Sequence, residues 1–487
     1  MKGTFRASMA WLHTGLGLIT GWVLFAIALS GTLSVFRESI STWMRPELPT
    51  APVQTIDATA HAVAWLTDHA PKSPAWYLAV PTHRAPYVFG TWEKPSGSYI
   101  QKALNPLTGS PDGIRDTRGG EFFYRFHFEL QLPYPYGRLI AAVAALALVV
   151  ALVTGLIIHR RIFADFFTFR PNKGQRSWLD AHNLMGVIAF PFHLMISFTG
   201  AVTLVTMLLP WGPQAVYKQD IMAGYTDLNP AIETRPASGK PGHLTSVLPV
   251  LREAEKRFKG AGISQVYIYN PSDAASLITV MAGNNGTIST LSRSLTFDGT
   301  TGLLMREHVE TRPAVRTYTF LYGLHIARFT PDVTRWLYFL SGLMLTAVIG
   351  SGMRLWTVKR LRLPHHLGHV LTDRLNVGVL AGAPLAFASY FLANRLLPPM
   401  SAHRADHEVQ CVFIVWGLAL LFALVRPARR TWPEMLTTCA FACFAIAAVS
   451  SPWTNPVTQS TALVSLFFSS AFGYAAFRAL NGKAKQT

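Results

Sequence analysis

The sequence predicts a polytopic α-helical membrane protein of about eight spans, with two small α+β domains outside the membrane. Half of the 487 residues are hydrophobic and only 14% are charged, a balance typical of membrane proteins rather than soluble enzymes. Apolar stretches near the ~20 residues that cross a bilayer are interrupted by two long polar segments. An internal repeat also relates the first and third apolar stretches.

The expected spans and domains follow one another along the chain. Residues 1–37 contain the first transmembrane helix, whose apolar stretch is too long for a cleavable signal peptide and lacks a small-residue cleavage site. The remaining parts are an outer domain at 38–136, a helix at 137–160, a loop at 161–180, a helix at 181–210, an outer domain at 211–334, a helix at 335–358, a loop at 359–375 and four additional helices within 376–480.

The positions of lysine and arginine predict the orientation of the chain. These residues cluster in the short loops 161–180 and 359–375 and near both ends of the chain. The positive-inside rule therefore places both termini and these loops in the cytoplasm, and the segments 38–136 and 211–334 on the opposite side. These clusters beside membrane lipid explain the net charge of +18, so no nucleic-acid partner is expected.

Several classes of function lack the motifs that they require. The three cysteines lie within apolar runs and form neither CxxC nor CxxCH, which argues against disulfides and covalent c-type haem. The chain has no HExxH, no GxGxxG after a strand and no P-loop. Metalloprotease, dinucleotide-binding and ATPase activities are therefore not expected.

The first and third spans share a pattern of histidine and glycine. HTGLG in the first span corresponds to HNLMG in the third, and a further glycine follows each at the same interval. Both helices run outward, so the repeat is a parallel one with an approximate twofold axis along the membrane normal. The equivalent histidines should therefore lie at the same depth, near the cytoplasmic face. The matching residues are His13, Gly17 and Gly31 in one span and His182, Gly186 and Gly200 in the other.

The two outer segments repeat as well. Each has a helix-like stretch, strand-like runs and an Asx-x-x-Thr-Gly turn, which begins at Asn105 in the first segment and at Asp298 in the second. Both turns are expected to be hairpin tips, because Asn or Asp opens such turns and glycine tolerates positive φ. An aromatic-rich approach to the next span follows each turn, EFFYRFHFEL and YTFLYGLHIARF, with His127 and His325 in corresponding places.

These motifs resemble those of PepSY-associated transmembrane proteins. The resemblance covers about residues 1–365 and includes the HxxxG helices, the N/DxxTG turns, the FHFEL and GLHIAR approaches, and IIHRRIFADFFTFR followed by QRSWLDAHN. It implies PepSY-like outer domains and a location in the bacterial inner membrane. Within the family, the chain resembles inner-membrane ferric-siderophore reductases of the ferrioxamine type, which carry b-type haems among four core helices. The helices within 376–480 extend beyond this four-helix unit.

His13 and His182 are the expected axial ligands of one haem b near the cytoplasmic face. Haem iron takes axial imidazoles, and helix bundles supply them from facing helices. A single histidine on an apolar helix is usually a packed, hydrogen-bonded residue. Within a membrane, however, an ionisable side chain is costly and tends to mark function.

His193 is expected to ligate a second haem b, nearer the outer surface. It lies eleven residues after His182, which in a straight helix places both on one face, about 16.5 Å apart along the axis. The first span has Leu24 at the corresponding place, so the partner of His193 must come from elsewhere. Either His325 or His127 could reach it from the outer side, and we favour His193 with His325 as haem-iron ligands; the symmetry also allows His127 and His325 to ligate one haem together.

Further histidines near the cytoplasmic face have less specific signals. His159 ends the second span and is a candidate ligand of the inner haem, a contact to its propionates or part of a quinol site, although a solvated helix end is an ordinary alternative. His365, His366 and His369 form HHLGH, where a metal site is conceivable but a basic turn at the membrane surface is favoured.

The expected function is one-electron transfer across the membrane by two haem b groups. The electron comes from quinol or an unidentified cytoplasmic donor and leaves to a ferric siderophore held by the outer domains. Because hard oxygen ligands prefer Fe(III), reduction loosens the chelate and releases Fe(II). Two alternatives remain open: a non-catalytic PepSY-type membrane protein that binds a periplasmic partner, and a component of an iron or siderophore transporter.

Overall fold

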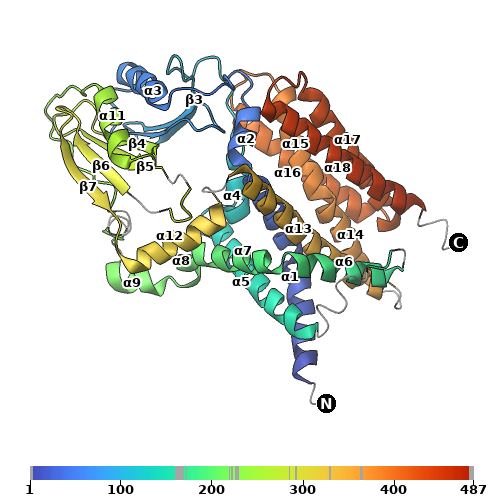
Figure 1. The fold of residues 1–487 in the computed structure, drawn as a ribbon. Helices are drawn as coiled ribbons and strands as arrows, with labels where there is room; N and C mark the ends of the chain where they lie inside the picture. Colours follow the sequence, from blue (N-terminus) through green and yellow to red (C-terminus); the bar gives the residue numbers. More distant parts are fainter. Residues whose placement is uncertain are drawn as a thin grey trace. The chain divides into compact units, whose positions relative to one another are not determined.

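The chain folds into two compact units. The computed structural model describes residues 4–159, 169–171, 173–218, 220, 223–224, 227, 230–283, 286–290, 293–327, 331–361, 363 and 366–481 (Figure 1). We call Met1–Met44, Thr117–Leu208 and Val333–Thr487 the helical unit, and Arg45–Asp116 with Leu209–Asp332 the sheet unit.

The helical unit is built from long apolar helices. Among the described residues, seven helices are long and apolar enough to cross a membrane, or eight if a bent pair counts as one span. This finding supports the prediction of a polytopic helical membrane protein. The helices that pass this test are α1 (Phe5–Ser34), α5 (Tyr136–Ile158), α13 (Asp332–Arg360), the joined α14 (Leu367–Leu380) and α15 (Gly382–Leu396), α16 (Arg404–Val425), α17 (Ala428–Val449) and α18 (Pro456–Asn481).

The third span is bent, and here the expectation of one straight helix is wrong. The chain forms α6 (Gln175–Ile188), α7 (Phe190–Thr203) and the short α8 (Val205–Leu208), with a bend of 72° between α6 and α7. Pro191 lies in the first turn of α7, where it cannot donate a backbone hydrogen bond and its ring disfavours a continuous helix. The separation of about 16.5 Å calculated along a straight axis therefore does not apply to His182 and His193.

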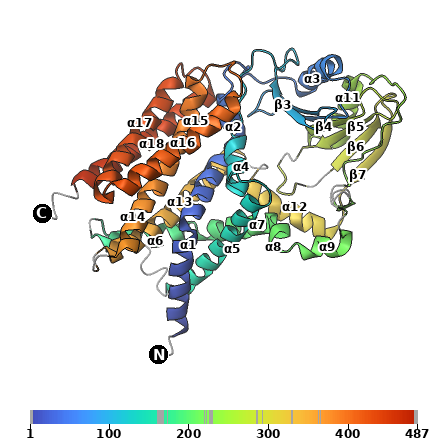
Figure 2. The same ribbon diagram turned by 180° about the vertical axis from the view of Figure 1, so that it is seen from behind.

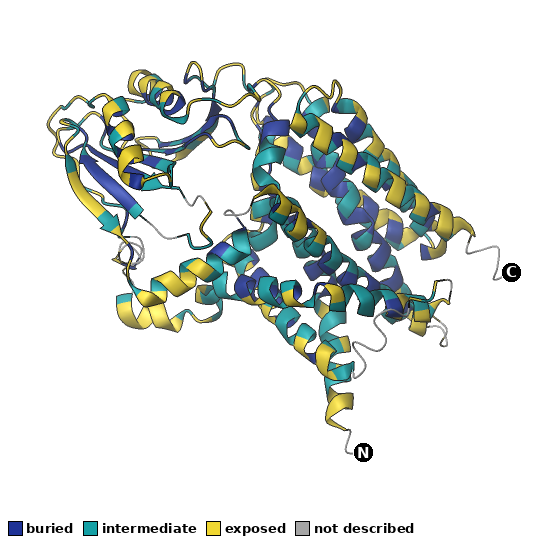
Figure 3. Cartoon of the chain, viewed as in Figure 1, coloured by how far each residue is buried: buried dark blue, intermediate teal, exposed yellow. Residues whose placement is uncertain are grey.

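The C-terminal helices pack beside the first half of the helical unit. Figures 1 and 2 show α15 and α16 beside α2 (Arg37–Trp43) and α4 (Glu121–Glu129) from both sides. Figure 3 shows exposed residues that recur along α17 and α18, and Phe441, Phe444 and Phe467 on these helices are 57–69% exposed. Apolar residues that stay exposed on a membrane-spanning helix suit contact with lipid tails.

The sheet unit contains one continuous antiparallel sheet rather than two separate ones. Both long polar segments contribute strands, and the strand order is β3-β2-β1-β4-β5-β6-β7. The segments meet where β1 pairs with β4, with Tyr77 opposite Tyr267. This pairing satisfies the backbone groups of two strands that would otherwise be sheet edges. The strands are β1 (Ala75–Ala79), β2 (Val88–Glu93), β3 (Tyr99–Leu104), β4 (Ile263–Tyr269), β5 (Leu277–Ala282), β6 (Arg293–Asp298) and β7 (Leu304–Val309).

Two helices cover one face of this sheet and share one core with it. Leu66 of α3 (Thr55–His69) and Leu251 of α11 (Val247–Phe258) are fully buried with strand residues from both segments. Strand residues alternate between the two faces, so Trp76 enters this core while its neighbour Tyr77 does not. The unit also contains α9 (Trp211–Tyr217) and α12 (Pro313–Ile326).

The two Asx turns differ in their setting. Asp298 accepts hydrogen bonds from the backbone of Thr300 and Thr301, and Gly302 follows at φ 73°, so this turn is the tip of the β6–β7 hairpin. Asn105 accepts from Leu107 and is followed by Gly109 at φ 74°, but this turn ends β3, and the structure describes no strand between it and α4. The expectation of a hairpin tip therefore holds for the second turn only.

We expect the sheet unit to lose stability in acid through Glu310. Hydrogen bonds from the Arg312 side chain, at 2.7 and 2.9 Å, lower the pKa of Glu310 from 4.5 to about 2. A carboxylate with a depressed folded-state pKa contributes stability above pH 4.5, and this contribution is lost as the pH falls towards about 2. Unfolding of the full chain, followed by tryptophan fluorescence between these limits, should therefore depend on pH less steeply in Glu310→Gln.

The control for this prediction is Glu307→Gln. Glu307 pairs with Arg293, but its side chain is 38% exposed, so solvent screens the pair. This variant should keep the steep acid dependence. If Glu310→Gln keeps it as well, the Glu310–Arg312 pair does not contribute to acid sensitivity.

Candidate functional site

His13 and His182 lie together in the helical unit. His13 is on α1 and His182 is on α6, and both side chains are partly buried. Their ring centres are 6.2 Å apart and the ring planes are inclined at 78°. The structure thus brings together the two histidines that the sequence repeat relates.

The Nδ1 atom of each ring forms a hydrogen bond with a backbone carbonyl oxygen on another helix. His13 Nδ1 lies 2.9 Å from the Ala151 carbonyl oxygen on α5, and His182 Nδ1 lies 2.9 Å from the Val348 carbonyl oxygen on α13. A carbonyl oxygen only accepts hydrogen bonds, so each Nδ1 must carry the proton. Each Nε2 then keeps a lone pair, and neither Nε2 makes a hydrogen bond to any described residue.

The residues that surround the two rings have the same spacing in the second span as in the fourth. A hydroxyl follows each carbonyl residue by three positions, and a glycine follows by four. A Cβ atom on Gly155 would lie 3.2 Å from His13 Cε1, and one on Gly352 would lie 3.0 Å from His182 Cε1, so each glycine leaves room for its ring. The matching sets are Ala151, Thr154 and Gly155 in ALVTG, and Val348, Ser351 and Gly352 in VIGSG.

Sequence reasoning missed these supporting residues. The signal that indicates them is a second repeat, ALVTG in the second span and VIGSG in the fourth, which share the same intervals of small and hydroxyl residues. A carbonyl bond to Nδ1 is the usual support of a metal-ligating histidine, because it sets the tautomer and the orientation of the ring.

The separation of the two ring centres agrees with that expected for two imidazoles that bind one iron. A metal–imidazole bond is about 2.0 Å long and each ring centre lies about 1.1 Å behind its bonding nitrogen, so two rings on opposite sides of one iron have centres about 6.2 Å apart. The observed separation is 6.2 Å. Both Nε2 atoms are also in the neutral form that binds iron, so the donor set suits a haem.

His193 lies on α7 and its side chain is completely buried. Its Nε2 is 3.3 Å from the Ser341 carbonyl oxygen on α13, a long contact. Its Nδ1 is buried and has no hydrogen-bond partner among the residues that the structure describes. A buried polar atom without a partner is costly, so this nitrogen is a candidate for binding something that the polypeptide does not supply.

His127 repeats the arrangement of the inner pair. It lies on α4, and its Nδ1 is 2.8 Å from the Ile27 carbonyl oxygen on α1. A Cβ atom on Gly31 would lie 2.6 Å from the ring, so here again a glycine on the neighbouring helix leaves room for a histidine. His325 is on α12, which belongs to the sheet unit. Its proposed pairing with His193, or with His127, stays a prediction.

Comparison with known proteins assigns the family. Residues 10–359 match the model of the PepSY-associated TM region. The chain belongs to the PepSY-associated transmembrane family. An uncharacterized protein of Pseudomonas aeruginosa is 26% identical over 356 residues, which cover 68% of this chain and 87% of that protein.

The family match covers the histidines on the first four spans and ends within α13. The helices of this PepSY-associated protein from α14 to α18 therefore lie beyond the matched residues. The matched residues include His13, His127, His182, His193 and His325.

The remaining histidine candidates of this PepSY-associated protein lie near helix ends. His159 is partly buried after the last residue of α5, and its backbone N–H donates to the Gly155 carbonyl. His366 caps the N-terminus of α14, and its ring centre is 5.0 Å from that of His369; His365 lies outside the described residues. Within the described part of the chain, no group of three or more His, Cys, Asp or Glu residues could hold a metal ion.

Proposed function

We propose that this membrane protein carries two haem b groups and transfers electrons across the bacterial inner membrane to a ferric siderophore, releasing Fe(II) on the periplasmic side. The observation that supports this proposal best is the pair of His13 and His182, with ring centres 6.2 Å apart and both Nδ1 atoms bound to carbonyl oxygens. A partner-binding protein or a transporter would not need two imidazoles arranged in this way.

In this proposal His13 and His182 would hold the inner haem through their Nε2 atoms. The carbonyl oxygens of Ala151 and Val348 keep both rings in the Nδ1–H tautomer, and they raise the basicity of the ligating nitrogens. The two rings come from different helices, so the helical unit itself fixes their spacing. A bound haem supplies a one-electron carrier whose potential depends on its axial ligands and on its burial.

The outer haem would be held by His193 and His325, with His127 as the alternative partner of either. His127 has the same Nδ1–carbonyl support as the inner ligands, and His193 is buried with an unpartnered Nδ1. The proposed pairing of His193 with His325 and the alternative of His127 with His325 give different single-variant results. Loss of the outer haem in His193→Ala, with retention in His127→Ala, would support the first pairing.

A ferric chelate is a suitable substrate because the two oxidation states of iron differ in their affinity for oxygen ligands. Hard oxygen donors hold Fe(III) much better than Fe(II), so one-electron reduction weakens the chelate without cleaving the siderophore. We place the chelate at the sheet unit, on the periplasmic side. The electron donor would be quinol or a cytoplasmic protein, because the sequence has no nucleotide-binding motif.

The test begins with the colour of the purified protein. Protein from haem-replete cells should be red, with a b-type α-band after reduction and about two haems per chain by pyridine haemochrome. Reduced protein should then be mixed anaerobically with ferric siderophores while haem reoxidation and Fe(II) capture are followed. The gallium(III) forms are the matched control, because they have the same shape but cannot accept an electron. Colourless protein would overturn the proposal, and so would red protein that no ferric chelate reoxidises.

A further inference from the structure

We propose that the C-terminal helices α15 and α16 position His127 by holding α4 against α1, an inference that rests on the proposed function in its alternative pairing, in which His127 is an outer haem ligand. The helices beyond residue 359 lie outside the family match, and the sequence assigns them no role. Their contacts with α4 provide one.

Helix α4 is too short to hold its own position. It has nine residues and ends at Leu130, whose φ is 54°. Isolated helices shorter than about 12 residues are marginal in water, and their stability comes from packing. The location of His127 therefore depends on what packs against the rest of α4.

The phenylalanines of α4 pack on the C-terminal helices. Phe122, Phe123 and Phe126 are at most 2% exposed. Their ring centres lie 6.2, 5.3 and 5.3 Å from that of Phe387 on α15. Tyr390, one turn further along α15, lies 4.5 Å from Phe122. These apolar contacts hold α4 on the side of α15, while His127 contacts α1.

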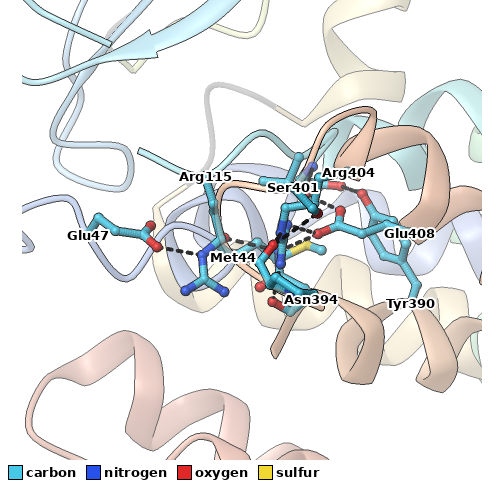
Figure 4. A network of polar contacts seen from close by, with 11 residues as sticks. Met44, Glu47, Arg115, Tyr390, Asn394, Ser401, Arg404 and Glu408 are labelled. Carbon is cyan, nitrogen blue, oxygen red and sulfur yellow. Dashed lines mark hydrogen bonds and ion pairs between the residues drawn. The ribbon is translucent and has the colours of Figure 1, made fainter. Parts of the chain in front are cut away.

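A buried polar network holds the chain just before α4. Tyr390 Oη donates to the Gly119 carbonyl at 3.0 Å. Thr117 Oγ1 donates to Glu408 of α16 at 2.5 Å, and Asn394 of α15 donates to the same carboxylate at 2.8 Å. Glu408 also pairs with Arg404, and both side chains are fully buried (Figure 4). Hydrogen bonds inside a low-dielectric region are strong and directional, so this network fixes where α4 begins.

The network extends to α2 as well. Asn394 Nδ2 lies 3.1 Å from the Met44 carbonyl oxygen, directly after α2, and Arg395 donates to the Trp43 carbonyl at 2.7 Å. The C-terminal helices therefore hold both the end of α2 and the start of α4. Because these contacts and the His127–Ile27 bond belong to the same helical unit, loosening α15 should move His127.

The principal test is Phe387→Ala in the full-length protein. Loss of a buried phenylalanine ring leaves a cavity beneath α4. The signal that remains in His182→Ala identifies the outer haem. We expect Phe387→Ala to shift the EPR gmax and the reduction potential of that haem and to leave those of the inner haem unchanged. Phe441→Ala is the matched control, because Phe441 is 69% exposed on α17.

A second readout does not need haem. Amide hydrogen exchange of residues 121–129 should become about tenfold faster in Phe387→Ala, while exchange of α3 in the sheet unit stays unchanged. If wild-type protein is colourless, the proposed function fails, and this exchange measurement still decides whether α15 positions α4. Unchanged exchange and an unchanged outer haem would overturn the inference, as would equal changes in both haems.

Tyr390→Phe is a milder second variant for the case in which Phe387→Ala does not fold. It removes only the hydroxyl that donates to Gly119 and keeps the aromatic ring. If Phe387→Ala does not fold, a smaller shift of the outer haem signal alone in Tyr390→Phe supports the inference, and an unchanged signal overturns it.

Discussion

The His182→Ala variant is expected to lose one haem per chain and to retain the other. The reason is geometric: His182 and His13 have ring centres 6.2 Å apart, and each has one nitrogen held by a carbonyl and the other available to iron. Alanine cannot bind iron, and His13 alone would leave the haem with one axial ligand. The pyridine haemochrome ratio should fall from about two to about one, and one low-spin EPR signal should disappear.

The control for this variant is His407→Ala. His407 lies on a different membrane-spanning helix, α16, and its side chain is exposed. This variant should keep the full haem content. Full haem content in His182→Ala would contradict the pairing of His13 with His182, and loss of both haems from a folded protein would show that the two sites are not independent.

Glu408→Gln is expected to destabilise the protein by about 3–5 kcal/mol, because it leaves the charge of Arg404 buried without its carboxylate partner. Both side chains are 0% exposed in the structure. Glutamine has nearly the same shape but only one acceptor oxygen, so the change removes the charge and also one of the two oxygens that accept from Thr117, Asn394 and Arg404. Thermal and denaturant unfolding in detergent micelles would measure the effect.

The double variant Arg404→Met/Glu408→Gln distinguishes charge from packing. Removing both charges of a buried pair is often close to neutral, whereas removing one is costly. The double variant should therefore be more stable than Glu408→Gln alone. If the single variant is as stable as the wild type, the buried pair does not anchor α16, and if the double variant is the less stable of the two, packing rather than charge governs this region.

The sequence was sufficient to pair His13 with His182 but insufficient to find what supports them. The repeat HxxxG lies within single helices, so equal intervals predict equal depth. The hydrogen-bond partners lie 138 and 166 residues further along the chain, on α5 and α13. No local pattern specifies which carbonyl on a facing helix a ring will meet, because helix packing sets that register.

The bend in the third span is a second feature that the sequence does not predict. Pro191 lies within an apolar run whose length predicts one straight helix. Proline removes a backbone donor and clashes with the preceding turn, yet many membrane helices accommodate it, so its effect depends on the neighbouring helices. The bend of 72° therefore had to be observed.

Local sequence determined the membrane-spanning helices, because a run of about 20 apolar residues can satisfy its backbone only within itself. It also determined the repeat and the family motifs, which depend on intervals along the chain. Tertiary structure decided that β1 and β4 join the two outer segments into one sheet, and that α15 and α16 bury the phenylalanines of α4. These outcomes pair residues that are hundreds of positions apart, so the physical cause lies in packing and not in local preference.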